Sequence, residues 1–316
     1  MQTTQSIVVK TISIVLPFFN EAESIPHFFV RLNTVISKIP DCRFELICIN
    51  DGSQDTTFQA LEAAKLLHPA ITIVDLTRNF GKEAALTAGL EFSTGEAVIF
   101  LDTDLQHPPE LIPEFISKWR SGALVVLARR ASRSTEGAFY RVLADAFYRL
   151  YNSISDVKIP ANTGDYRLID RQVCDALKCL PESRRFMKGL FAWVGYEHEI
   201  VEYEVTPRAY GRTSFNKWKS WNFAVEGITS FSTVPLRLWT YAGLLVTTVG
   251  FFYAGWIILR AMILGIDTPG YVTLLASVIF FGGLQLMGIG ILGEYIGRIY
   301  IETKNRPIYL VKRIIK

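Results

Sequence analysis

Two long apolar runs in the C-terminal third of the chain are the feature that most constrains its fold. They cover residues 238–264 and 271–292, and the second run contains no charged residue. Each run exceeds the ~20 residues that cross the hydrocarbon layer of a bilayer. Only residues 265–270, which include a proline and two glycines, separate them. The pattern therefore predicts a transmembrane hairpin whose two ends lie on the same side of a membrane.

Basic residues after the second run set the expected orientation of this hairpin. They are Arg298, Lys304, Arg306, Lys312, Arg313 and Lys316. Positive charge beside membrane helices favours the cytoplasmic side, and residues 1–10 contain no apolar signal-peptide core. We therefore expect a cytoplasmic N-terminal domain and a basic cytoplasmic tail.

The composition divides the chain into three segments, with boundaries at 1–215, 216–236 and 237–316. The middle segment is rich in aromatic residues such as Trp218 and Trp221, which suit the headgroup layer, so we expect interfacial amphipathic helices there. Small residues in the second apolar run permit close helix packing, and a homo-oligomer through these helices is a further expectation. The small residues are Gly282, Gly283, Gly288, Gly290 and Gly293.

Residues 1–215 alternate short apolar runs with amphipathic stretches. The runs predict strands at 12–16, 44–49, 71–76, 97–101 and 124–128, and the stretches predict helices at 22–37, 56–67, 83–92 and 109–119. Such alternation indicates an α/β fold with a mostly parallel, Rossmann-like sheet that is covered on both faces. Further along, the pattern predicts an amphipathic helix at 136–155, a loop at 162–167, a helical pair at 170–193 and a half-exposed strand at 199–205.

Polar residues follow four consecutive predicted strands. They are Asn20, Glu21, Asn50, Asp51, Arg78, Asn79, Asp102 and Asp104. Right-handed crossovers bring the carboxyl ends of parallel strands to one edge of the sheet. Open α/β sheets bind their ligands at that edge, so these residues predict a binding site.

The motif Asp102-Thr103-Asp104 is the sharpest local signal. Residues two apart in an extended segment face the same way, so both carboxylates are expected to face one point. Carboxylates together with substrate phosphates suit Mg²⁺ or Mn²⁺. Such an ion neutralises the charge that develops on a departing diphosphate, and Arg130 and Arg133 are candidate cationic clamps for the same charge.

Composition excludes several other classes of protein. The net charge of +3 is too small for a typical nucleic-acid reader, and we expect no nucleic-acid partner. The cysteines form no C-x-x-C pair and no histidine lies at zinc-ligand spacing, so they are expected to be reduced packing residues. They are Cys42, Cys48, Cys174 and Cys179. The histidines are predicted to be structural or surface residues, namely His27, His68, His107 and His198.

Five motifs match one known family in order. They are Val15-Leu16-Pro17-Phe18-Phe19-Asn20-Glu21, Asn50-Asp51-Gly52-Ser53, Arg78-Asn79-Phe80-Gly81-Lys82, Leu101-Asp102-Thr103-Asp104-Leu105-Gln106 and Gly164-Asp165-Tyr166-Arg167. With them the chain resembles the polyprenyl-phosphate glycosyltransferases of the GT-A fold, which include dolichol-phosphate mannose synthases and bactoprenol glucosyltransferases. The two-helix hairpin resembles the bactoprenol branch, and the resemblance covers nearly the whole chain.

The resemblance implies a role for each matching position. The nucleotide-sugar-binding set is Pro17, Asn20, Glu21, Asp51, Lys82, Asp102, Thr103, Gln106, Arg130, Arg208 and Ser214. Pro17, Glu21 and Asp51 would hold the base and ribose, and Asp102 and Asp104 would hold the metal and diphosphate. Gln106 would lie near the donor sugar, and Arg130 would contact the diphosphate. Asp165 would lie at the reaction centre. Many relatives carry a lysine where this chain has Ser214, so one expected phosphate contact is missing.

The implied reaction is an inverting transfer of a hexose to a lipid phosphate, with Asp104 and Asp165 as catalytic residues. A phosphate acceptor is already anionic near neutral pH and needs little help from a base. Candidate residues for binding it are Arg133, Arg184, Arg185 and Lys188. The branch resemblance favours glucose from UDP-glucose, undecaprenyl phosphate as acceptor and a bacterial inner membrane.

Other functions remain open on the sequence alone. GDP-mannose or another UDP-sugar is an alternative donor. A processive polysaccharide synthase would carry a Gln-x-x-Arg-Trp motif and more membrane helices, and neither is present. A non-catalytic membrane subunit would leave the strand-end carboxylates without a purpose, and a nucleotidyltransferase would not need the hairpin.

Overall fold

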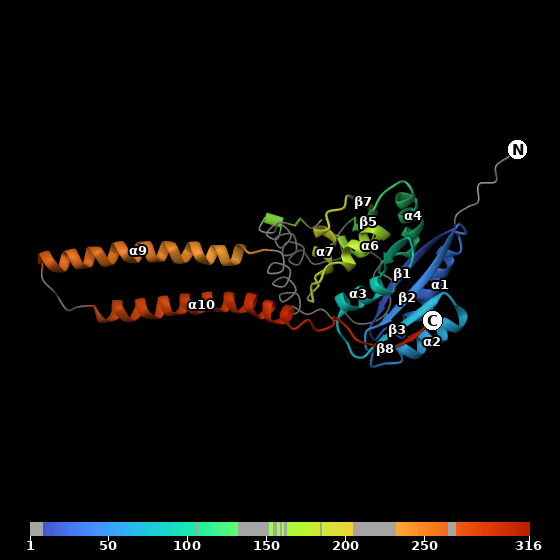
Figure 1. Cartoon of the computed structure of the whole chain (residues 1–316), viewed down its shortest axis with the longest axis horizontal. Coiled ribbons are helices and arrows are strands. Elements are labelled where there is room, and N and C mark those ends of the chain that lie inside the picture. Colours follow the sequence, from blue (N-terminus) through green and yellow to red (C-terminus); the bar gives the residue numbers. More distant parts are fainter. Residues whose placement is uncertain are drawn as a thin grey trace.

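The computed structural model describes residues 9–104, 106–131, 152–153, 157–158, 160, 163–183, 185–204, 232–264 and 270–316. Figure 1 shows an α/β domain from which two long helices, α9 and α10, extend side by side. Residues 216–231 of the interfacial segment predicted at 216–236, and residues 136–151 of the helix predicted at 136–155, lie outside the described residues, as does most of the turn between the long helices.

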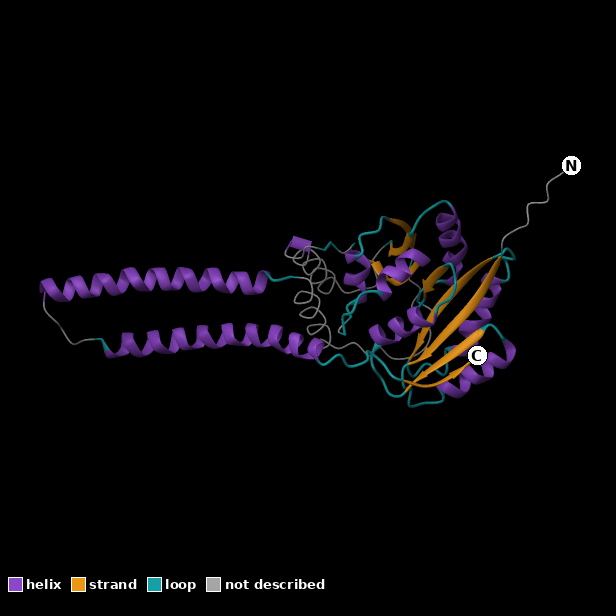
Figure 2. Ribbon diagram, viewed as in Figure 1, coloured by secondary structure: helices purple, strands orange, loops and turns teal. Residues whose placement is uncertain are grey.

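An eight-stranded sheet forms the centre of the domain, in the order β7-β5-β6-β4-β1-β2-β3-β8 (Figure 2). The strands are β1 Lys10–Phe18, β2 Cys42–Asn50, β3 Ile71–Leu76, β4 Ala97–Phe100, β5 Val125–Arg130, β6 Thr163–Asp170, β7 His198–Tyr203 and β8 Val311–Ile315. β1 pairs in parallel with β2 and β4, β2 with β3, and β5 with β7. β6 is antiparallel to β4 and β5, and β8 is antiparallel to β3. The predicted mostly parallel sheet is confirmed.

Helices cover both faces of this sheet. They are α1 Ile25–Ile36, α2 Thr57–Leu67, α3 Lys82–Phe92, the 3₁₀ turn η1 Pro109–Leu111, α4 Ile112–Arg120, α6 Arg171–Lys178 and α7 Met187–Trp193. One apolar cluster joins the sheet to α1, α2 and α4, and two others join its opposite face to α3, α6 and α7. The predicted helical pair at 170–193 is thus α6 and α7.

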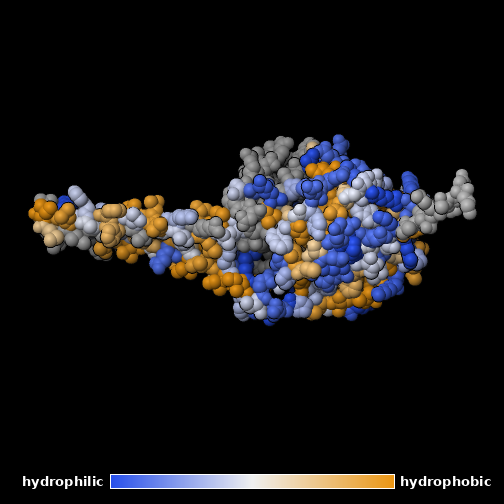
Figure 3. Space-filling model, turned by 45° about the horizontal axis from the view of Figure 1, so that its top comes forward, coloured by the Kyte–Doolittle hydropathy of each residue, from blue (hydrophilic) through white to orange (hydrophobic). Residues whose placement is uncertain are grey.

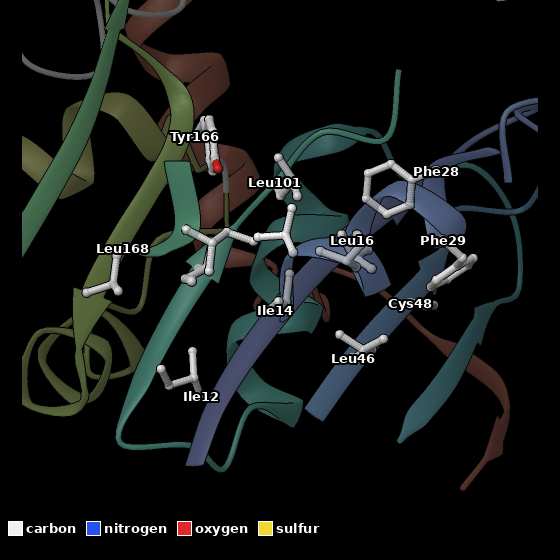
Figure 4. Close-up of a cluster of buried hydrophobic side chains, with 14 of the residues drawn as sticks. Ile12, Ile14, Leu16, Phe28, Phe29, Leu46, Cys48, Leu101, Tyr166 and Leu168 are labelled. Atoms are coloured by element: carbon white, nitrogen blue, oxygen red, sulfur yellow. The ribbon is translucent and has the colours of Figure 1, made fainter. Parts of the chain in front are cut away.

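The strand β1 shows why a continuous apolar run belongs in the middle of such a sheet. Ile12, Ile14 and Leu16 enter the cluster beside α1, whereas Val15 enters the cluster beside α3. Figure 4 shows the first three residues in the cluster that also contains Phe28 of α1. Because alternate residues of a strand point to opposite faces, the stretch Ile14-Val15-Leu16 is apolar on both faces, and Ser13 is a buried polar residue that donates a hydrogen bond to Glu45.

The predicted loop at 162–167 is wrong, because these residues enter β6 at Thr163. β6 lies between β4 and β5, with Phe100 opposite Arg167 and Val125 opposite Ile169. Its first half is polar, so no hydrophobic period marks it as a strand. Its partners supply the pairing, as strand formation depends strongly on neighbouring strands.

A second strand was not anticipated in the basic tail. Val311–Ile315 forms β8 and pairs with β3 at the edge of the sheet. The backbone amide of Thr77 donates to the carbonyl of Leu310 at 2.9 Å, which extends the contact by one further bond. The chain that follows α10 therefore belongs to the sheet of the N-terminal domain.

The long helices are α9 Val234–Leu264 and α10 Tyr271–Thr303, and both begin or end beyond the predicted runs. Among the described residues, the stretch 280–303 of α10 is long and apolar enough to cross a membrane, and α9 contains a shorter apolar stretch at 238–253. Apolar residues lie along the whole length of the hairpin (Figure 3). A Cβ at Gly288 of α10 would overlap the indole of Trp239, so this glycine allows the close approach of α9.

Candidate active site

The predicted polar residues gather at the carboxyl edge of the sheet. β1, β2 and β4 run in parallel, so the segments that follow them emerge at one edge. β6 runs in the opposite direction, and therefore its beginning, with Asp165, lies at that same edge. β4 ends at Phe100, so Asp102 and Asp104 follow the strand rather than extend it.

A lysine joins the carboxylates of two separate elements at this edge. Lys82, the first residue of α3, places its Nζ 2.7 Å from Asp102 Oδ1 and 2.7 Å from Asp165 Oδ2. The side chains of Asp102 and Asp165 are only 20% and 13% exposed. The site thus holds two largely buried carboxylates around one ammonium group, whose lysine side chain is 43% exposed.

These charges keep each other ionised. Burial favours protonated Asp165, but the positive charges of Lys82 and Lys188 outweigh it and lower the pKa of Asp165 to about 2. Burial also favours protonated Asp102, but Lys82 and His107 together lower the pKa of Asp102 far below its usual value. Loss of water alone would lower the pKa of Lys82, but the two carboxylates raise it.

Asp165 retains an unused acceptor. Its Oδ1 atom is buried and receives no hydrogen bond within the part of the chain that the structure describes. A buried acceptor without a donor is costly and is rare in folded proteins. Such an atom in a cluster of charged groups is suited to a ligand that completes the site.

The motif Asp102-Thr103-Asp104 fits a divalent cation by its donor chemistry. The described residues bring together no group of three potential metal ligands, but Mg²⁺ is commonly held by one or two carboxylates and the phosphates of a substrate. Burial and the negative charges of both aspartates raise the pKa of Tyr203, so both carboxylates lie within electrostatic reach of its hydroxyl. Asp104 Oδ1 also accepts the amide of Gln106 at 3.1 Å.

His107 belongs to the site, although its sequence position predicts a structural or surface residue. Its Nε2 lies 3.4 Å from Asp102 Oδ2, and its Nδ1 lies 2.7 Å from the hydroxyl of Tyr203. The ring is buried and therefore fixes the orientation of the Asp102 carboxylate. The sequence feature that could have placed His107 in the site is its position in the loop that carries Asp102 and Asp104.

The loops after β1 and β2 interlock on the other side of the site. Asn20 has a left-handed backbone, with φ of 53°, and its amide donates to Ser53 Oγ at 3.0 Å. Its Oδ1 accepts the amide of Gln54 at 2.9 Å. The amide of Glu21 donates to Thr57 Oγ1 at 2.9 Å. The predicted residues Asn20 and Glu21 are therefore tied to the β2–α2 connection.

Asp51 ties the same connection to the segment before α3. Its carboxylate accepts the amides of Phe80 at 2.7 Å and Gly81 at 3.0 Å, and burial raises its pKa. Thr103 Oγ1 donates to the carbonyl of Pro17 at 3.1 Å, which links the loop after β4 to β1. The loops after β1, β2 and β3 thus contact one another directly, and the loop after β4 contacts β1.

Of the four basic residues predicted to bind an acceptor phosphate, the structure describes Arg185 and Lys188, and these two have different partners. The positive charge of Lys188, on α7, acts on Asp165. The guanidinium of Arg185 instead donates to the carbonyls of Leu180 at 2.6 Å and Glu182 at 3.4 Å, so its donors hold the loop before α7. Arg130 lies at the end of β5, where its side chain hydrogen-bonds to Tyr203. Outside the described residues lie Arg133, Arg184, Arg208 and Ser214.

Arg167 is a buried cation that the motif contains but to which no role was assigned. Its Nη2 donates to the carbonyl of Gly164 at 2.7 Å, and its guanidinium lies 3.9 Å from the ring of Phe191. Burial lowers its pKa to about 10. With Lys188 it lines a cavity of about 220 Å³ between the sheet and α7.

Together these features define a class of protein. A mostly parallel sheet with carboxylates on the loop after β4, facing a lysine and a further aspartate, is the arrangement of a glycosyltransferase of the GT-A fold. The chain belongs to glycosyl transferase family 2, which matches residues 13–178. The GtrB C-terminal hairpin matches residues 234–299 and, with the apolar helix α10, associates the chain with a membrane.

Two relatives are similar over nearly their whole length. A prophage bactoprenol glucosyl transferase homolog of Escherichia coli is 50% identical over 305 residues, which are 96% of this chain and 99% of the relative. The bactoprenol glucosyl transferase of Shigella phage SfX is 50% identical over 301 residues, 95% of this chain and 98% of the relative. A solved glucosyl-3-phosphoglycerate synthase from Mycobacterium tuberculosis is 20% identical with a TM-score of 0.48, covering 70% of this chain and 78% of that one.

Proposed function

We propose that this protein transfers glucose from UDP-glucose to undecaprenyl phosphate at the cytoplasmic face of a bacterial inner membrane. The observation that carries the proposal is the 50% identity to bactoprenol glucosyl transferases across both the sheet domain and the hairpin. The product would be a lipid-linked monosaccharide for glycosylation of the cell envelope.

The reaction is a direct displacement that inverts the anomeric carbon. An oxygen of the lipid phosphate attacks the anomeric carbon, the bond from that carbon to the diphosphate oxygen breaks, and UDP leaves with the electron pair. The attacking phosphate is anionic near neutral pH, so no side chain has to remove a proton from it. The enzyme therefore acts mainly by positioning and by stabilising charge.

The charged cluster supplies that stabilisation. Asp102 and Asp104 would hold Mg²⁺ or Mn²⁺, which neutralises charge on the leaving diphosphate when it is bound. Lys82 adds a fixed positive charge beside them. Asp165, ionised and with an unused oxygen, would position the reactants or stabilise positive charge at the anomeric carbon.

The remaining predicted residues divide between donor and acceptor. Pro17 at the end of β1, with Glu21 and Asp51 in the interlocked loops, would hold the base and ribose. Asn20 and Thr103 would complete the nucleotide-binding set. Contacts to the sugar and diphosphate are assigned to Gln106, Arg130, Arg208 and Ser214. Contacts to the lipid phosphate are proposed for Arg133, Arg184 and Lys188, whereas the donors of Arg185 hold the loop before α7.

The experiment is transfer of radiolabelled sugar to undecaprenyl phosphate in detergent, with UDP-glucose, UDP-galactose and GDP-mannose as separate donors. Metal-dependent label in a lipid-extractable product, from UDP-glucose above the others, is the expected result. Asp104→Ala should abolish it, whereas Glu114→Ala, on the exposed face of α4, should not. A protein that binds nucleotide but forms no lipid product from any donor would overturn the proposal.

A further inference from the structure

Strand β8 brings an arginine against a buried carboxylate of β3. Arg313 Nε donates to Asp75 Oδ2 at 2.9 Å, and the guanidinium lies 3.6 Å from the ring centre of Phe58 on α2. The Asp75 side chain is 6% exposed. The Arg313 side chain is 46% exposed and covers the Asp75 carboxylate, so removing its charge leaves Asp75 without the cation that pairs with Oδ2.

The other oxygen of Asp75 holds the end of β2. Asn50 Nδ2 donates to Asp75 Oδ1 at 2.7 Å, and both side chains are buried. This bond fixes the rotation of the Asn50 amide, and its Oδ1 then accepts the amide of Ser53 at 3.3 Å. Asn50 directly precedes Asp51, so the bond sets the exit of the chain into the β2–α2 connection.

The series continues from Ser53 to the loop after β1. Ser53 Oγ accepts the amide of Asn20, and Asn20 Oδ1 accepts the amide of Gln54. The connection has little freedom to adjust, because a Cβ at Gly52 would overlap the backbone of Arg78. Hydrogen bonds therefore link Arg313 of β8 to both loops that would hold the nucleotide.

We infer that Arg313 is a positioning residue for nucleotide binding, acting through Asp75 and Asn50. It touches no substrate, and its effect is to keep the β2–α2 connection in the binding conformation. The inference rests on the proposed function for the identity of the ligand. It makes the strand that follows the membrane hairpin a supporting part of the donor site.

The contacts also explain why this position needs arginine. The guanidinium donates to a carboxylate and stacks on an aromatic ring at the same time, which the ammonium group of lysine does poorly. Arg313→Lys should therefore keep the charge but lose part of the positioning. Lys312, the exposed neighbour on the same strand, provides a matched control as Lys312→Gln.

The first test is hydrogen exchange of the full-length protein in detergent, without nucleotide. In Arg313→Gln, the amides of Ser53 and Gln54 should exchange about tenfold faster, because their opening becomes easier by about 1.4 kcal/mol. Arg313→Lys should fall between this variant and the wild type, and Lys312→Gln should match the wild type. Unchanged exchange at these amides in Arg313→Gln would overturn the inference.

The second test separates positioning from stability. Calorimetric titration with UDP, and with GDP as a second probe, should show about fivefold to tenfold weaker binding of the preferred nucleotide by Arg313→Gln. The KM for the sugar donor should rise by the same factor, while kcat and the KM for the lipid stay within about twofold. A lower melting temperature and kcat, with unchanged nucleotide affinity, would assign Arg313 a structural role only. If the wild type transfers no glucose, the proposed function fails, and the exchange comparison still decides the role of Arg313.

Discussion

The two sides of the candidate site are built in opposite ways. On the donor side, the loops after β1 and β2 satisfy one another through side-chain and backbone hydrogen bonds, as Asn20 and Asp51 illustrate. Around β6 and α7, charged groups are buried close together, and Asp165 and Arg167 retain polar atoms without partners among the described residues. The first side satisfies its own hydrogen bonds, whereas the second leaves buried polar atoms that a bound ligand could satisfy. Substitutions on the two sides should therefore fail in different ways.

The largest effect should come from the charged side. Asp165→Asn removes a charge while keeping the shape of the side chain, and kcat should fall by about 10²–10³-fold. Folding should survive, because Lys82 retains Asp102 as a partner. Transfer assays and thermal unfolding on the same preparation measure both quantities. A melting temperature that fell in proportion to activity would contradict this contrast between the two sides.

The donor side should fail through stability. Gly52→Ala forces an L-residue to a φ of 62° and drives its Cβ into the backbone of Arg78, at an expected cost of about 2–4 kcal/mol. Gly81→Ala is the matched control. Its φ of 98° is also unfavourable, but its Cβ would meet no atom within 4 Å in the described part of the chain. In denaturant unfolding, the free energy of unfolding should fall more in Gly52→Ala than in Gly81→Ala.

A pH-dependent difference should distinguish the charged side from the donor side. Burial and the charge of Asp165 raise the pKa of Glu83 from 4.5 to about 7. At pH values between 4.5 and about 7, the Glu83 carboxyl keeps its proton in the folded protein but loses it in the unfolded chain. The contribution of Glu83 to the free energy of unfolding therefore falls as pH rises through this range. Glu83→Gln, which retains an acceptor for the amide of Met187, should gain up to about 3 kcal/mol relative to wild type from pH 4.5 to 7. If the free energies of unfolding of Glu83→Gln and wild type changed with pH in parallel, Glu83 would not titrate between pH 4.5 and 7.

The smallest expected effect concerns the acceptor. Lys188→Gln removes a cation near Asp165, and the KM for undecaprenyl phosphate should rise about fivefold to tenfold while the KM for UDP-glucose changes little. Lys178→Gln, at the end of α6, is the control for a general loss of positive charge. An equal effect of both substitutions would indicate attraction to the membrane surface rather than a contact with the lipid phosphate.

Sequence reasoning succeeded where a signal was local. Each of the strands β1 to β4 contains a short, mostly apolar run, and the residues that follow these strands reach one edge whatever the details of the loops. It failed at β6 and β8, since Gly164 and Lys312 lie in strands whose pairing partners are distant in sequence. Within the site, Lys82, Asp102 and Asp165 were all identified by motifs. The bridge that Lys82 forms between the two carboxylates, and the contact of His107, depend on the packing of separate elements.

The pairing of β8 with β3 has a consequence for the synthesis of the protein. A ribosome completes β3 early, but the residues that cover this edge follow both long helices, and Arg313 meets Asp75 from 238 positions away. Until then, β3 presents an open edge to other chains, which is a known route to aggregation. The nascent sheet can close only after the hairpin has left the ribosome. Premature termination within the hairpin should therefore yield aggregation-prone fragments rather than a soluble enzyme without its anchor.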